Sequence, residues 1–221
     1  MRKQNPAGFL FFIVFVLFFA SCTIVRNDGS ESIQGEIGDL GVKASTFDPK
    51  QYADMIWEPV VLPRIDGLAV DFNELLDGLN SNEEAASRKY GYRLLEEGNH
   101  YNFAVKGTVK FLSIDTSSAN GTVTVDFAPY DGQADCVVMI GPVFRSLAIR
   151  DIQNTISLND FTNQVEFARL ARELNSKARD QILEGVDFSQ HIGQEAEIIG
   201  VFAYEGRGSS IELMPVRLSL K

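Results

Sequence analysis

The chain has 221 residues, of which 45% are hydrophobic, and a formal net charge of −10. This composition is sufficient for a buried core. An acidic surface repels nucleic acid and anionic lipid headgroups, so we expect no nucleic-acid partner. It also argues against attachment to a membrane through basic side chains, which leaves an inserted or covalent anchor.

The first 21 residues have the parts of a secretory signal peptide. Two basic residues, Arg2 and Lys3, precede an uncharged apolar run from Ala7 to Ala20. Phe19 occupies the third position before Cys22, where ordinary signal cleavage requires a small residue. The segment Phe19-Ala20-Ser21-Cys22 instead resembles the lipobox of bacterial lipoproteins. The resemblance implies cleavage before Cys22 and attachment of acyl chains to this cysteine.

The alternative is an uncleaved membrane span, because residues 4–25 carry no charge. A span needs roughly 20 apolar residues, and the strongly apolar run is shorter than this. We therefore expect a protein held to the membrane by acyl chains on Cys22, each buried methylene contributing about 0.8 kcal/mol. Thr23 stands where an aspartate retains such lipoproteins in the inner membrane, which favours the outer membrane. With Cys22 acylated, Cys136 has no disulfide partner, and its apolar neighbours predict a buried strand thiol.

The remainder divides into a tether and one domain. Residues 22–48 lack a sustained hydrophobic period and predict a tether, and residues 49–221 predict a single periplasmic domain. Within it, residues 49–96 read as a helical lobe, whose first helix should end before Pro59 and pack through Trp57. Residues 100–221 read as mainly β.

The β part predicts an α+β fold. Apolar residues alternate with polar ones from Asn102, and again after the turn at Asn120-Gly121. Further strands are predicted at 135–143, 195–204 and 211–220, the last with a bulge near Pro215, where the apolar residues change phase. One long helix, from about 160 to 183, precedes the last two strands. This order fits a small bent antiparallel sheet or an OB-like barrel with an N-terminal helical lobe.

Two arginines with apolar neighbours mark a candidate site in this acidic chain. Arg145 and Arg150-Asp151 follow the third strand, and the first turn of the helix that comes next contains Asn163 and Gln164. At 100° per residue, both amides fall near the middle of that helix's apolar stripe, and Asn175 falls at its edge. We therefore expect Asn163 and Gln164 to point inward, where polar groups need partners.

These residues permit two interpretations. In the first, they form an anion or sugar pocket, with Arg145 or Arg150 supplying charge and the amides binding hydroxyls. Alternatively they form an internal network, in which Arg150 pairs with an acid and the amides tie loop 152–160 to the sheet.

Sequence signatures of catalysis are absent. His100 and His191 lack the spacing of zinc ligands, and neither a nucleophile elbow nor a phosphate-binding loop occurs. We therefore expect no metal, no cofactor and no enzymatic activity.

The chain resembles a family of predicted periplasmic lipoproteins, domain of unknown function family 2291. The similar stretches are Cys22–Val25, Tyr101–Gly107, Gly141–Arg145, Ile149–Asp151, Asp160–Gln164, Leu174-Asn175, Gly200–Phe202 and Pro215–Leu218. The resemblance implies a place in the periplasm and a role near sugar-type ABC importers. The leading hypothesis is thus a non-catalytic binding or accessory domain with a protein or small-solute partner; the alternatives are a solute-binding accessory of a sugar-type importer and an uncharacterised hydrolase.

Overall fold

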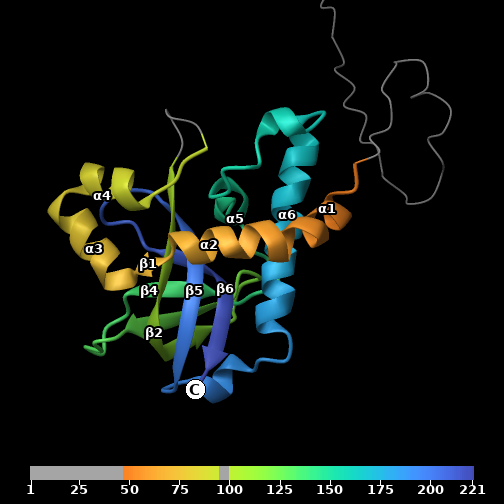
Figure 1. Ribbon diagram of the computed structural model, residues 1–221. Helices are drawn as coiled ribbons and strands as arrows, with labels where there is room; N and C mark the ends of the chain where they lie inside the picture. The colour runs from red at the N-terminus through yellow and green to blue at the C-terminus, as the bar shows by residue number, and fades with distance from the viewer. Residues whose placement is uncertain (1–46, 95–99) are drawn as a thin grey trace, which may run out of the picture. The chain divides into compact units, whose positions relative to one another are not determined.

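The computed structural model describes residues 47–94 and 100–221 (Figure 1). The predicted signal peptide at 1–21, the lipidation site Cys22 and nearly all of the predicted tether lie outside these residues. The described residues belong to one compact unit. Its elements in chain order are α1 (Pro49–Ile56), the π-helical turn η1 (Trp57–Val61), α2 (Leu62–Leu68), β1 (Val70–Asp71), α3 (Phe72–Ser81), α4 (Glu83–Tyr90), β2 (Tyr101–Asp115), β3 (Thr122–Phe127), β4 (Cys136–Met139), α5 (Ala148–Asp151), η2 (Leu158–Asp160), α6 (Gln164–Leu183), η3 (Phe188–His191), β5 (Glu195–Tyr204) and β6 (Glu212–Leu220).

Five of the strands close into a barrel. Their order is β2-β3-β4-β6-β5, and β2 also pairs with β5 along its first ten residues, from Tyr101 opposite Tyr204 to Lys110 opposite Glu195. The pairs are antiparallel except β4 with β6, and β1 adds to β2 in parallel. A long helix between the third and fourth barrel strands completes the topology of an OB fold, as the sequence predicts.

Two hydrophobic cores lie on opposite sides of the barrel wall. The alternating apolar residues of the strands fill the interior, where Phe103, Phe111 and Phe202 are fully buried together with Phe72 and Leu75 of α3. The second core lies outside the wall and joins α1, η1, α2, α5 and α6 to β5 and β6. The N-terminal helical region therefore divides between the two cores.

The helix that begins at Pro49 does not end before Pro59, contrary to the sequence prediction. It continues through η1 into α2. The wider π turn accommodates Pro59, which has no N–H to donate. Trp57 is fully buried there, and its indole N–H donates to Gln181 Oε1 of α6, so it packs this helix onto the domain as expected.

The predicted long helix begins four residues later than expected. Residues 158–160 form the separate turn η2, and Asn163 is the N-cap of α6, accepting from the backbone N–H of Glu166. Cap residues have extended backbone angles, so Asn163 does not belong to the helical periodicity.

Cys136 is a buried strand thiol, as predicted, and burial raises its pKa far above the usual range. No described helix has the length and apolar character needed to cross a membrane.

Candidate functional site

A cleft of about 460 Å³ opens where α5 and the loop before it meet the ends of β2, β4, β5 and β6. We call it the Asp151 cleft. Its apolar wall contains Leu94, Met139, Leu147, Ala148 and Ala203, and its polar lining is His100, Asn102, Arg145, Ser146, Asp151, Glu205, Ser210 and Glu212.

Closure of the barrel brings the two strand walls of the cleft together. Asn102 near the start of β2 pairs with Ala203 near the end of β5, although 100 residues separate them in the chain. Glu205 and Ser210 belong to the loop that joins β5 to β6, and Glu212 opens β6.

The third wall is an irregular segment, residues 140–147, that leaves β4. Gly141 donates its backbone N–H to Asn120 O at 2.8 Å, and a Cβ atom at this position would lie 2.2 Å from that same backbone. Only glycine permits this approach, which ends the strand and turns the chain toward the cleft. Arg179 of α6 also donates to Pro142 O at 2.7 Å.

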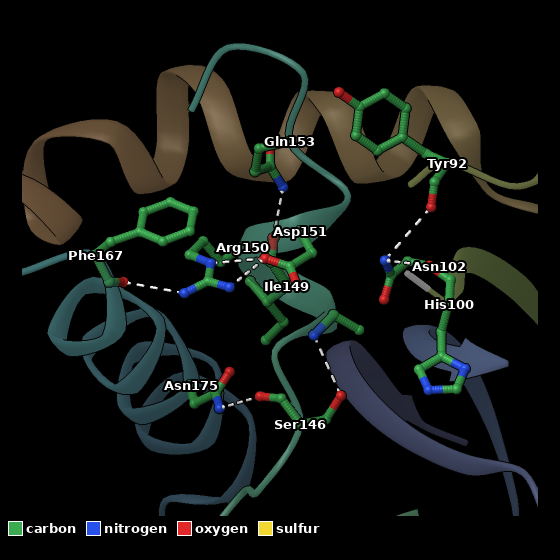
Figure 2. A network of polar contacts seen from close by, with 11 residues as sticks. Tyr92, His100, Asn102, Ser146, Ile149, Arg150, Asp151, Gln153, Phe167 and Asn175 are labelled. Atoms are coloured by element: carbon green, nitrogen blue, oxygen red, sulfur yellow. Dashed lines mark hydrogen bonds and ion pairs between the residues drawn. The ribbon is translucent and has the colours of Figure 1, made fainter. Parts of the chain in front are cut away.

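Arg150 lies beneath the cleft and is 6% exposed. Its Nε and Nη2 atoms both lie 2.6 Å from Asp151 Oδ1, and Nη1 donates to Phe167 O at 3.2 Å. The guanidinium carbon lies 3.7 Å from the centroid of the Phe167 ring (Figure 2). These contacts engage the guanidinium, so its charge is balanced by Asp151 inside the protein and is not presented to a solute.

Asp151 connects this internal network to the cleft. Its side chain is 20% exposed and belongs to the cleft lining. Burial raises the pKa of its carboxyl, and the Arg150 guanidinium, which lowers that pKa, offsets only part of the effect.

Asn175 holds the segment 140–147 against α6. Its Nδ2 donates to Phe144 O at 3.2 Å and to Ser146 O at 2.7 Å, and the residue is 6% exposed. The Oγ atom of Ser146 in turn accepts from the N–H of Ala148, at the start of α5 (Figure 2). A buried amide thus fixes the backbone from which Arg145 projects.

The predicted candidate residues therefore separate into three groups. Arg145 and Asp151 line the cleft, and Arg150 and Asn175 support it from the interior. Asn163 and Gln164 are exposed at the start of α6, so the prediction that their amides point inward is wrong. Asn163 caps the helix, and the side of α6 that Gln164 and Val165 occupy faces away from the core, since Val165 is 56% exposed while Phe167 is buried.

Sequence reasoning missed Asn102, Glu205 and Glu212 as lining residues. The two glutamates carry no sequence signal, since an acidic chain has many. Asn102 had one available signal: it is an amide followed directly by the three apolar residues 103–105 of a predicted strand. Among the described residues, no group of three or more His, Cys, Asp or Glu side chains could hold a metal ion.

Comparison with known proteins supports the fold and the family. The fold is similar to the crystal structure of an OB-fold protein from Thermotoga maritima, with a TM-score of 0.64 and 21% sequence identity, over 80% of this chain and 100% of that chain. Comparison with curated proteins gives no match. The profile of the predicted periplasmic lipoproteins DUF2291 matches residues 12–219. The protein thus belongs to this family, the predicted periplasmic lipoproteins of domain of unknown function 2291, and it is a lipid-anchored protein of the periplasm.

Proposed function

We propose that this lipoprotein is a non-catalytic binding domain whose Asp151 cleft holds a small polar solute. The observation that carries the proposal is that two buried side chains, Arg150 and Asn175, hold parts of the cleft lining in place. Arg150 positions the Asp151 carboxylate of the lining, and Asn175 positions the backbone that carries Arg145 and Ser146. Its volume of about 460 Å³ lies in the range of small-molecule sites, roughly 300–1,000 Å³, and its lining combines an apolar wall with a few polar groups.

The contacts of the cleft favour binding over hydrolysis. A hydrolase needs a nucleophile in contact with a base. In the part of the chain that the structure describes, the His100 ring makes no hydrogen bond to a serine, and Ser146 Oγ instead accepts a backbone N–H. Asp151 is held by Arg150, an arrangement that positions a carboxylate without activating a neighbour.

The second candidate is a solute-binding accessory of a sugar-type ABC importer. The size of the cleft favours it, because a monosaccharide fits within this volume and its hydroxyl groups match the polar lining. Both candidates place the solute in the same cleft and differ only in what happens after binding.

A ligand screen tests the proposal. Thermal unfolding of the protein, purified from membranes in mild detergent, is followed with sugars, amino sugars, sugar acids, amino acids and nucleosides. We expect at least one class to raise the melting temperature. Ser210→Trp, which places a large ring in the cleft, should abolish the rise, and Ser118→Trp, at an exposed turn outside the cleft, should preserve it. If no class raises the melting temperature, the proposal fails, and a protein partner becomes the better hypothesis.

We further propose that Cys22 is the anchoring residue, with 1–21 as the signal peptide, 22–48 as the tether and 49–221 as the periplasmic domain. The lipobox-like segment before Cys22 supports this assignment. Metabolic labelling with a fatty acid should mark the wild type and not Cys22→Ala. Label that persists in the variant contradicts the assignment. Fractionation of the labelled protein decides between the outer membrane, which Thr23 favours, and the inner membrane.

A further inference from the structure

The least accessible polar side chain of the Asp151 cleft presents a hydrogen-bond acceptor to it. Asn102 is 5% exposed and lines the cleft. Its Nδ2 lies 3.4 Å from Tyr92 O and 3.5 Å from His100 O (Figure 2). Backbone carbonyls only accept hydrogen bonds, so these two contacts fix the amide nitrogen on their side and leave Oδ1 on the other.

The Oδ1 atom of Asn102 has no donor among the described residues. This oxygen is not one of the described side-chain atoms that are buried without a partner, so water reaches it in the free protein, and a solute that enters the cleft displaces that water. A solute that offers an N–H or O–H group would satisfy it. A solute group that only accepts hydrogen bonds, such as a carboxylate or a phosphate, would leave it unsatisfied.

The charges of the lining point in the same direction. The carboxylate of Asp151 is paired with Arg150, which leaves the two carboxylates of Glu205 and Glu212 in the lining against the single guanidinium of Arg145. Neither glutamate forms an ion pair within residues 47–94 and 100–221, whereas Arg150 is already engaged by Asp151. The cleft therefore has a negative potential that attracts cations and disfavours anions. This argues against the anion ligand that the two arginines suggest from the sequence alone.

We infer that the Asp151 cleft takes a small solute that carries a protonated amino group, which it recognises through Asn102 Oδ1 and the surrounding carboxylates. An ammonium group has three donors, no acceptor and a positive charge, and thus matches both features of the lining. The inference rests on the proposed binding function and specifies the chemistry of its ligand.

The test uses three solutes that share one ring and differ in charge: glucosamine, glucose and glucuronate. Binding to the detergent-purified protein is measured by titration calorimetry at pH 6.5, where the amine is protonated. Ion pairs at a solvated rim are weak, so we expect glucosamine to bind roughly fivefold more tightly than glucose. Glucuronate should bind more weakly than glucose.

Matched variants separate the role of the rim charge from a general effect of charge. The double variant Glu205→Gln/Glu212→Gln should reduce the preference for glucosamine to less than about twofold, because it removes the two unpaired carboxylates. Glu184→Gln, an exposed glutamate after α6 and outside the cleft, should leave the preference unchanged.

The binding results distinguish a failure of this inference from a failure of the proposed binding function. Equal binding of glucosamine and glucose, or a preference that survives in the double variant, overturns this inference and leaves the proposed function in place. No binding of any of the three rings overturns this inference, and the proposed function then depends on the other classes of the screen.

Discussion

The substitution Asn175→Leu tests whether a buried amide supports the cleft. Leucine has a similar size and removes the donor to Phe144 O and Ser146 O. The loss of two hydrogen bonds and the exposure of their acceptors to a partly apolar environment cost about 3 kcal/mol. Asn175 Oδ1 is itself buried without a partner among the described residues, and its removal returns about 1 kcal/mol. The expected loss in unfolding free energy is therefore about 2 kcal/mol, or about 4–8 °C in melting temperature for a chain of this size.

Urea unfolding followed by the fluorescence of Trp57 measures this loss. Trp57 is the only tryptophan in the sequence and is fully buried, so its emission reports on the packing of the outer core. Asn175→Asp should destabilise at least as much, since it keeps the size and removes the donor. Asn163→Ala serves as the comparison, with a loss of about 1 kcal/mol for an exposed helix cap. If Asn175→Leu is as stable as the wild type, the amide does not hold segment 140–147, and the reasoning is refuted.

Three further predictions follow from the same structure. Gly141→Ala should lower the unfolding free energy by about 2–3 kcal/mol in a denaturant titration, because its Cβ would overlap the backbone of Asn120; wild-type stability would show that this approach is not needed. Burial and the charge of Asp126 raise the pKa of Asp135, and a hydrogen bond from the backbone N–H of Phe127 offsets part of this rise. The folded state therefore holds the proton of Asp135 more tightly than the unfolded chain does. Wild-type stability should accordingly fall as the pH rises from the ordinary carboxyl pKa of 3.8 through the raised one; Asp135→Asn should lack this fall, and parallel stability–pH curves for the two proteins would contradict the assignment. The Cys136 thiol should resist iodoacetamide in the folded protein and react in urea, and rapid labelling without denaturant would show that the strand is accessible.

The sequence alone located the strands of the barrel, although the third, predicted at 135–143, ends at Met139. Periodicity located β5 at 195–204 as predicted, and the change of apolar phase near Pro215 corresponds to the register shift between the pairs Ile199–Arg217 and Gly200–Pro215. These features are local, because side chains on a strand alternate whatever the strand packs against. The long helix was predicted for the same reason, and its start was misplaced because the cap at Asn163 interrupts the period.

Only the tertiary structure decided which polar residues face a cleft. Whether an amide points inward depends on its own surroundings: Asn163 is exposed although Phe167 in the first turn of α6 is buried, whereas segment 140–147 covers Asn175. Asn102 and Glu212 lie 110 positions apart in the chain and line the same cleft because the barrel closes, which no local pattern encodes. The sequence could therefore identify the two arginines as unusual, but only packing showed that Arg150 is buried beside Asp151 and that Arg145 lines the cleft.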